Sequence, residues 1–179
     1  MDRNKLTQKS MEALQGAQAL AIGAHHPQLE QIHLLAALLR QEGGLVPQLL
    51  RKMDVTVESL EAQVQAYLRR IPSVTGSREA DRMYISGDLD EALNAAQAQA
   101  EAMKDEFMSV EHLLLGLVEA ARGDVKSVLD TYRITREGIL QALQSVRGSQ
   151  RVTSDSPEGT YEALEKYGTD LVRRAREGK

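Results

Sequence analysis

The chain has 179 residues and a formal net charge of -4, and 27% of its residues are charged and 42% hydrophobic. It contains no Cys, which excludes disulfides, thiol nucleophiles and thiolate metal sites. The mild charge, without a block of Lys and Arg interleaved with aromatic residues, argues against nucleic acid as a partner.

The composition predicts an all-α fold, because one Phe, five Tyr and no Trp stand among abundant Ala, Leu and Gln. In the first part of the chain, apolar spacing predicts four helices, with Thr7 as the N-cap of the first. We expect these helices at residues 6–24, 30–41, 46–53 and 57–70. The segment His25-His26-Pro27 ends the first of them, and we expect both His side chains to be exposed in that loop.

Residues 71–85 contain Pro, Gly and charges without a helical period, which indicates a linker between repeats. The second part, 86–147, follows the same scheme, and we expect Ser86, Ser109 and Thr135 to cap three of its helices. Residues 148–159 have the composition of a flexible linker. A last amphipathic helix is expected from 160 to about 176.

The two parts are copies of one unit, 79 residues apart. The run His33-Leu34-Leu35 returns as His112-Leu113-Leu114, and the offset holds without a gap from Leu14 and Leu93 to Gln65 and Gln144. A constant offset of this kind indicates one supersecondary unit used twice. We therefore expect an all-α fold of two pseudo-twofold-related four-helix repeats, about eight helices, with an additional C-terminal linker helix. The length allows one core or two small cores packed together.

No catalytic or metal site is predicted for this chain. It has no phosphate-binding loop followed by Lys-Ser or Lys-Thr, no HExxH pair and no GxSxG elbow. The repeated His33 and His112 either lie in the first turn of a buried helix, bonded to backbone, or act as a pH switch or ligand contact. A polar N-terminus and the lack of a long apolar run predict a cytoplasmic protein that does not bind membranes.

Several motifs resemble the Clp N-terminal repeat domain, which precedes the ATPase rings of AAA+ proteins. They are Thr7 and the two runs that contain the repeated His, Ile32-His33-Leu34-Leu35 and Ser109-Val110-Glu111-His112-Leu113-Leu114. Three further runs are similar to the bacterial disaggregase branch of that family: Gln41-Glu42-Gly43-Gly44, Val146-Arg147-Gly148 and the tail 161–171. The resemblance covers essentially the whole chain. It implies a Clp N-terminal domain at 1–147 (repeats at 1–70 and 86–147), a linker at 148–159, and at 160–179 the start of the segment leading into the first AAA+ domain.

The resemblance also implies a function. Domains of this branch engage unfolded or aggregated polypeptides through a shallow groove and pass them to the ATPase rings of a stress-response chaperone for threading. For the full-length protein it implies an AAA+ ATPase that uses ATP and magnesium, forms a homohexamer and works with the DnaK chaperone system through domains outside this chain. The chain itself is expected to be a monomer that is not an enzyme and holds no cofactor.

The family's binding residues match this sequence at Thr7, Asp105 and Glu111, and its apolar groove maps near Leu89 and Leu93. Each polar residue also has a structural interpretation. Thr7 suits a helix cap, and the two acids suit a solvated loop and a solvated first turn.

The two acids mark places where the copies differ, because the first copy has His26 at the position of Asp105 and Ile32 at that of Glu111. A protease-partner branch of the family uses its N-terminal domain to dock adaptor proteins or phosphoarginine-marked substrates. That mode requires a Glu before the repeated His in both copies. Since only Glu111 is present, the sequence favours the disaggregase function over this alternative.

Overall fold

The computed structural model describes residues 3–74, 83–148 and 150–158. Within these ranges it contains eight α-helices and no β-strand, which confirms the predicted fold class. A short 3-10 turn, Arg3–Lys5, precedes them. The expected helix 160–176 and most of the predicted inter-repeat linker lie outside the described residues. The helices are α1 (Gln8–Gly23), α2 (Gln31–Arg40), α3 (Leu45–Lys52), α4 (Val57–Arg70), α5 (Gly87–Ala102), α6 (Val110–Ala120), α7 (Gly123–Thr131) and α8 (Arg136–Arg147).

All four predicted N-caps are confirmed. The side-chain oxygens of Thr7, Ser86 and Thr135 each accept the backbone N–H of the residue three positions further along, at 3.1 to 3.2 Å. Ser109 caps α6 together with His112, whose ring Nδ1 accepts the Ser109 backbone N–H at 2.9 Å. These bonds satisfy donors that a helix otherwise leaves without a partner at its start, which fixes where each helix begins.

The two copies are joined by a reciprocal exchange of their N-terminal segments. Leu6 of the first copy pairs with Met108 of the second, and Ile85 of the second pairs with Leu29 of the first. Adding the offset of 79 converts one bridge into the other. The backbone bonds are equivalent as well: Met108 N–H donates to the Lys5 carbonyl at 2.7 Å, and Leu29 N–H donates to the Tyr84 carbonyl at 2.8 Å. The segment before the first helix of each copy thus pairs with the loop before the central helix of the other copy, as a pseudo-twofold relation requires.

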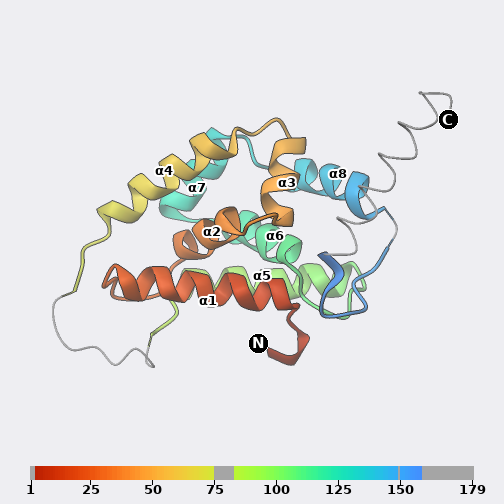
Figure 1. Ribbon diagram of the computed structural model, residues 1–179, viewed down its shortest axis with the longest axis horizontal. Helices are drawn as coiled ribbons and strands as arrows, with labels where there is room; N and C mark the ends of the chain where they lie inside the picture. Colours follow the sequence, from red (N-terminus) through yellow and green to blue (C-terminus); the bar gives the residue numbers. More distant parts are fainter. Residues whose placement is uncertain (1–2, 75–82, 149, 159–179) are drawn as a thin grey trace.

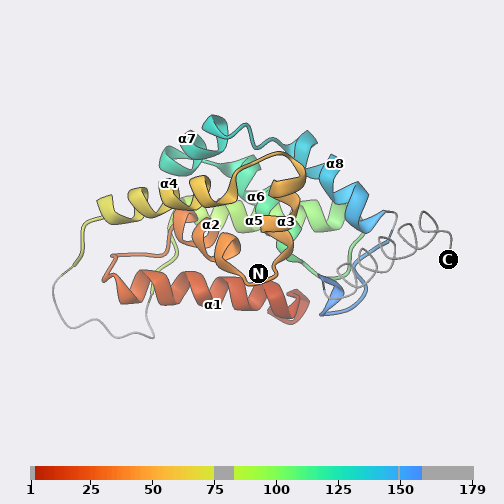
Figure 2. The same cartoon turned by 45° about the horizontal axis from the view of Figure 1, so that its top comes forward.

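A single hydrophobic core fills the described part of the chain, which decides between the one-core and two-core alternatives. Its centre is the pair α2 and α6, in which nine of ten and eight of eleven residues are buried. Figures 1 and 2 show these helices in the middle of the domain, with α1 and α5 along one side and α3, α4, α7 and α8 on the other. The outer helices pack across the copies, α3 against α8 and α4 against α7.

Helices α5 and α6 approach closely at Gly116. A Cβ added to Gly116 would lie 2.7 Å from the Ala96 backbone nitrogen and 2.8 Å from the Ala96 Cβ, and nearer still to the Ala92 carbonyl oxygen. The equivalent contact in the first copy is wider. There Ala37 replaces the glycine, and a Cβ on Gly16 would meet the Ala37 Cβ at an ordinary 3.6 Å.

We expect Gly116→Ala to lower the free energy of unfolding by about 2 kcal/mol or more, because backbone atoms of α5 cannot yield to the new methyl group. Gly16→Ala is the matched control. It should raise the free energy of unfolding by up to about 1 kcal/mol, since alanine favours the helix and has room there. Urea unfolding followed by circular dichroism measures both. Equal stability of Gly116→Ala and the parent chain would contradict the close contact.

Candidate functional site

The described residues hold no helix that is both long and apolar enough to cross a membrane. In the same ranges, no group of three or more His, Cys, Asp or Glu side chains is arranged to hold a metal ion. The site is therefore built from the predicted binding residues and their neighbours.

Thr7 lies at the start of α1 with its side chain fully buried. Its Oγ1 accepts the Ser10 N–H and lies 2.8 Å from Oε1 of Glu158, to which the hydroxyl donates. The same Glu158 oxygen lies 3.4 Å from the backbone nitrogen of Val110, the first residue of α6. The carboxyl group thus joins the starts of two helices from different copies, where free N–H groups and the helix dipole favour an acceptor.

Asp105 and Glu111 converge on one arginine. Arg147, the last residue of α8, donates from Nη2 to Asp105 Oδ1 and from Nη1 to Glu111 Oε1, the latter at 3.4 Å. His112 completes the cluster, since its Nε2 lies 2.7 Å from Asp105 Oδ2. The Asp105, Glu111 and His112 side chains have no exposed surface, and that of Arg147 is 4% exposed. The solvated positions considered for the two acids are wrong, because a buried cation holds both.

The surroundings shift the pKa values of two of these carboxyl groups. Burial alone would raise the pKa of Asp105, but hydrogen bonds from His112, the Val152 N–H and Arg147 outweigh it and hold the pKa below its ordinary value. Burial raises the pKa of Glu158, and the neighbouring Glu111 charge raises it further against the bond from Thr7. Asp105 is thus held as a carboxylate, whereas ionised Glu158 is disfavoured.

The segment 150–158, predicted as part of a flexible linker, lies across this cluster. Val152 has no exposed surface, and its N–H donates to Asp105 Oδ1 at 2.9 Å. Its carbonyl accepts the Glu106 N–H at 2.8 Å, and the carbonyl of Asp155 accepts the Gln8 N–H at 2.7 Å. In Figure 1 the segment returns from α8 towards the N-terminal end of α1. A stretch of the chain that is non-helical from 150 to 156 therefore lies over Thr7 and Asp105.

Leu89 and Leu93, the other predicted site residues, lie on α5 and are buried in the core, with 0% and 4% of their surface exposed. In the conformation described here they offer almost no surface to a ligand, so their contact with a polypeptide stays a prediction. A small hollow of about 60 Å³ lies near the C-terminal end of α5 instead, lined by Ala100, Asp105, Phe107 and Met108 among others.

Arg147 and Glu158 belong to the site but were not predicted. Arg147 could have been found by the same comparison of copies that marked the two acids, because the first copy has the buried Leu68 at its position. The three charged partners are therefore specific to the second copy. Glu158 has no equivalent in the repeat, and nothing in its sequence neighbourhood indicates that it reaches Thr7.

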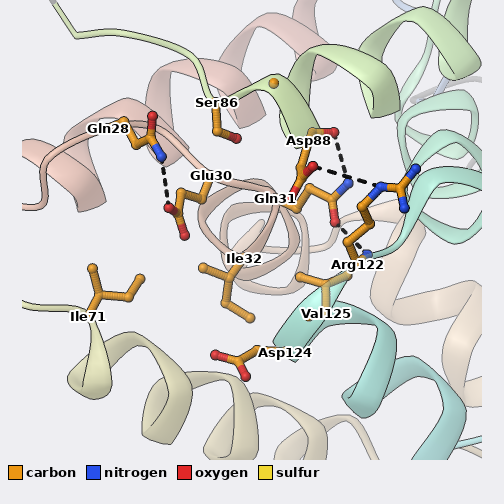
Figure 3. Close-up of a pocket in the computed structure, with 12 residues that line it drawn as sticks. Gln28, Glu30, Gln31, Ile32, Ile71, Ser86, Asp88, Arg122, Asp124 and Val125 are labelled. Atoms are coloured by element: carbon orange, nitrogen blue, oxygen red, sulfur yellow. Dashed lines mark hydrogen bonds and ion pairs between the residues drawn. The ribbon is translucent and has the colours of Figure 1, made fainter.

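The equivalent place in the first copy is an open pocket of about 410 Å³ (Figure 3). Ser86 lies at the position of Thr7 and Ile32 at that of Glu111, with Ile71 and Val125 nearby. Gln31 crosses the pocket wall, donating to the Asp88 carbonyl at 2.8 Å and accepting the Arg122 backbone N–H at 3.1 Å. No segment of the described chain fills this pocket in the way that 150–158 covers the second-copy surface.

The expectation that His26 is exposed is wrong, although His25 is exposed as expected. His26 is 4% exposed, and its Nδ1 lies 2.7 Å from Nε2 of His33. His25 adopts a positive φ of 55°, which turns the chain back after α1. His33 lies in the first turn of the buried α2 and accepts the Glu30 N–H through Nδ1 at 2.9 Å, which confirms the structural interpretation of the repeated His. The proton of neutral His33 is then on Nε2 and points to His26.

Comparison with known proteins gives the same relationship as the motifs. The family described as the Clp repeat (R) N-terminal domain matches residues 5–132. A protein named Chaperone protein ClpB from Bacillus cereus is 45% identical over 180 aligned residues, which cover 100% of this chain and 21% of that protein. The protein of the same name from Clostridium tetani is 38% identical with the same coverage.

Solved structures agree on the fold. The Hsp104 N-terminal domain from Candida albicans superimposes with a TM-score of 0.75 at 23% identity, covering 86% of this chain and 99% of that one. A ClpV N-domain solved in complex with a VipB peptide gives a TM-score of 0.63 at 20% identity, covering 87% and 91%.

The chain therefore belongs to the family of Clp repeat N-terminal domains. Within that family it corresponds to the N-terminal domain of ClpB-type chaperones. It spans 21% of the length of these curated relatives.

Stability should depend on pH through His33. Burial, followed by the neighbouring His26 charge, lowers the pKa of His33 from 6.5 to about 4. Between these values the unfolded chain binds a proton that the folded chain does not, so the free energy of unfolding decreases as the pH falls from 6.5 to 4, by up to about 3 kcal/mol from this group.

His33→Gln removes this group, so the loss of stability between pH 6.5 and 4 should become smaller by a comparable amount. Thermal and urea unfolding across that range measure the difference. His25→Gln is the matched control, since its side chain is exposed, and it should keep the parent's pH dependence. An unchanged profile in His33→Gln would refute the role of this buried ring.

Proposed function

We propose that this chain is the polypeptide-binding domain of an ATP-dependent protein disaggregase. Unfolded or aggregated segments bind at the surface of Thr7, Asp105 and Glu111 and are passed to ATPase rings for threading. In the full-length protein those rings use ATP and magnesium, assemble as a homohexamer and cooperate with the DnaK chaperone system. The 45% identity to a ClpB chaperone along the whole chain supports this assignment.

The main support for the proposal is that 150–158 binds to this surface largely through its main chain. Its main-chain groups bond to the Gln8 and Glu106 N–H groups and to the Asp105 carboxylate, and its buried apolar side chains are Val152 and Pro157. Bonds to the main chain do not depend on side-chain identity. A surface that bonds to main-chain groups in this way suits substrates of unrelated sequence, which is what a disaggregase must bind.

Affinity at such a surface should be modest. A short segment buries little area and loses conformational freedom when it binds, which places the dissociation constant at about micromolar or weaker. Weak binding serves a domain that hands its substrate on. The ClpV N-domain of the same fold was solved with a bound peptide, so a domain of this shape is able to hold one.

The burial of Leu89 and Leu93 bears on where apolar substrate side chains go. In the described conformation Val152 is buried at this surface, and we expect an aliphatic side chain of a bound substrate to take its place. We propose that Leu89 and Leu93 support this site from within α5, and that direct contact with substrate requires α5 to move.

Thr7→Ala combined with Glu111→Ala should weaken the binding of an unfolded polypeptide by about fivefold or more, because it removes a hydroxyl and a carboxylate from the site that 150–158 covers. Fluorescence anisotropy with labelled, reduced and carboxymethylated lactalbumin measures the affinity, and circular dichroism should show unchanged helix content. The matched control is Ser86→Ala with Ile32→Ala, the equivalent pair in the first copy, which should lose stability without losing affinity. Unchanged affinity of the Thr7/Glu111 variant would exclude this site.

The alternative function is the docking of adaptor proteins or of phosphoarginine-marked substrates. It predicts that the domain binds phosphoarginine in preference to an unmodified unfolded polypeptide. Since Ile32 replaces the acid in the first copy, we expect the labelled unfolded polypeptide to bind and a phosphoarginine peptide of matched length not to compete with it. A competition titration distinguishes the two. Binding of the phosphoarginine peptide alone would reject the disaggregase function.

A further inference from the structure

We propose that residues 150–158 act as an intrachain competitor, which covers the Thr7, Asp105 and Glu111 surface in the resting domain and must leave before an unfolded polypeptide binds there. This inference rests on the proposed function and adds a form of regulation to it. The occupant is a segment of this same chain.

The contacts of the segment use the same groups that a substrate would need. The Val152 N–H occupies Asp105 Oδ1, and the Glu158 carboxyl group occupies the Thr7 hydroxyl and the Val110 N–H. The Asp155 carbonyl takes the Gln8 N–H at the start of α1. Because each of these groups bonds to the segment, a second polypeptide cannot form the same bonds at the same time.

The segment is also attached weakly enough to leave. Val152 and Pro157 are the two apolar side chains that it buries, and the four residues between them, Thr153, Ser154, Asp155 and Ser156, are exposed. Glu111 Oε2 and Glu158 Oε2 are buried without a hydrogen-bond partner among the described residues, which is a cost of the docked state. Burial beside Glu111 raises the pKa of Glu158, so ionised Glu158 opposes docking further.

The first copy provides an internal comparison. Its equivalent surface lacks the acid and the arginine of the second copy, with Ile32 and Leu68 in place of Glu111 and Arg147, and it forms the open pocket of about 410 Å³. The charged groups that bond to the segment are Asp105, which accepts the Val152 N–H, and Arg147, which donates to the Gln150 carbonyl at 2.6 Å. The first copy has His26 and Leu68 at these positions. Because these charged residues occur only in the copy against which 150–158 packs, we infer that the contact is specific.

Two opposite variants of the 179-residue chain test the competition. Val152→Asn removes the buried side chain and should free the surface, so that labelled unfolded lactalbumin binds about fivefold tighter or more. The matched control is Thr153→Asn, at an exposed neighbour, which should bind as the parent does. Gln8→Cys with Asp155→Cys locks the segment instead. The backbones of these two residues are adjacent, since the Gln8 N–H donates to the Asp155 carbonyl at 2.7 Å, and the parent chain has no cysteine that could mispair.

The oxidised lock should weaken binding by about tenfold or more, and a reductant should restore it. Amide hydrogen exchange gives a second measurement. The Val152 and Glu106 N–H groups should be protected in the free chain and lose that protection when polypeptide is added.

If Val152→Asn, the oxidised lock and the parent all bind equally, the competition is refuted while the proposed function stands. If no form binds polypeptide and protection does not change, the proposed function itself fails. If Val152→Asn does not fold, the reversible disulfide lock still tests the competition.

Discussion

The two central helices, α2 and α6, have almost no face that tolerates water, and the rest of the domain is arranged to cover them. Nine of ten residues of α2 and eight of eleven of α6 are buried. One copy of the unit cannot enclose such a helix, because its own neighbours cover only part of the surface. The second copy supplies the remainder through α3 on α8, α4 on α7 and the crossed N-terminal segments. The proposed binding surface lies where one pair of those segments crosses, beside the Leu6–Met108 bridge.

Local signals explain why the helices could be predicted. Thr7, Ser86 and Thr135 lie directly before the helices they cap, and the 79-residue offset indicates the pseudo-twofold relation without structural information. The burial of Asp105 could not be predicted in this way. It depends on Arg147, 42 residues away in the sequence, and on a valine within a polar stretch. Nothing in the local composition of that stretch indicates that it packs on a helix start.

His26 shows the same limit on a smaller scale. A His-His-Pro sequence is typical of an exposed turn, and His25 fits that expectation. The positive φ at His25 nevertheless returns the chain so that His26 meets His33 at the start of α2. In the second copy the equivalent place holds Asp105 against His112. The backbone arrangement is thus shared between the copies, while the charge at the start of each central helix is not.

The crossed segments carry a consequence for how this domain could arise. A single unit that lends its N-terminal segment to a neighbour would form a symmetric pair of chains, whose two surfaces are identical by symmetry. Joining two units in one chain removes that restriction, since each position can then change in one copy alone. Ile32 and Glu111 are such a pair, because they occupy equivalent positions and differ in charge. One surface now carries its own tethered occupant, while the other forms a pocket that no described segment of the chain fills, an asymmetry that no homodimer of identical units could encode.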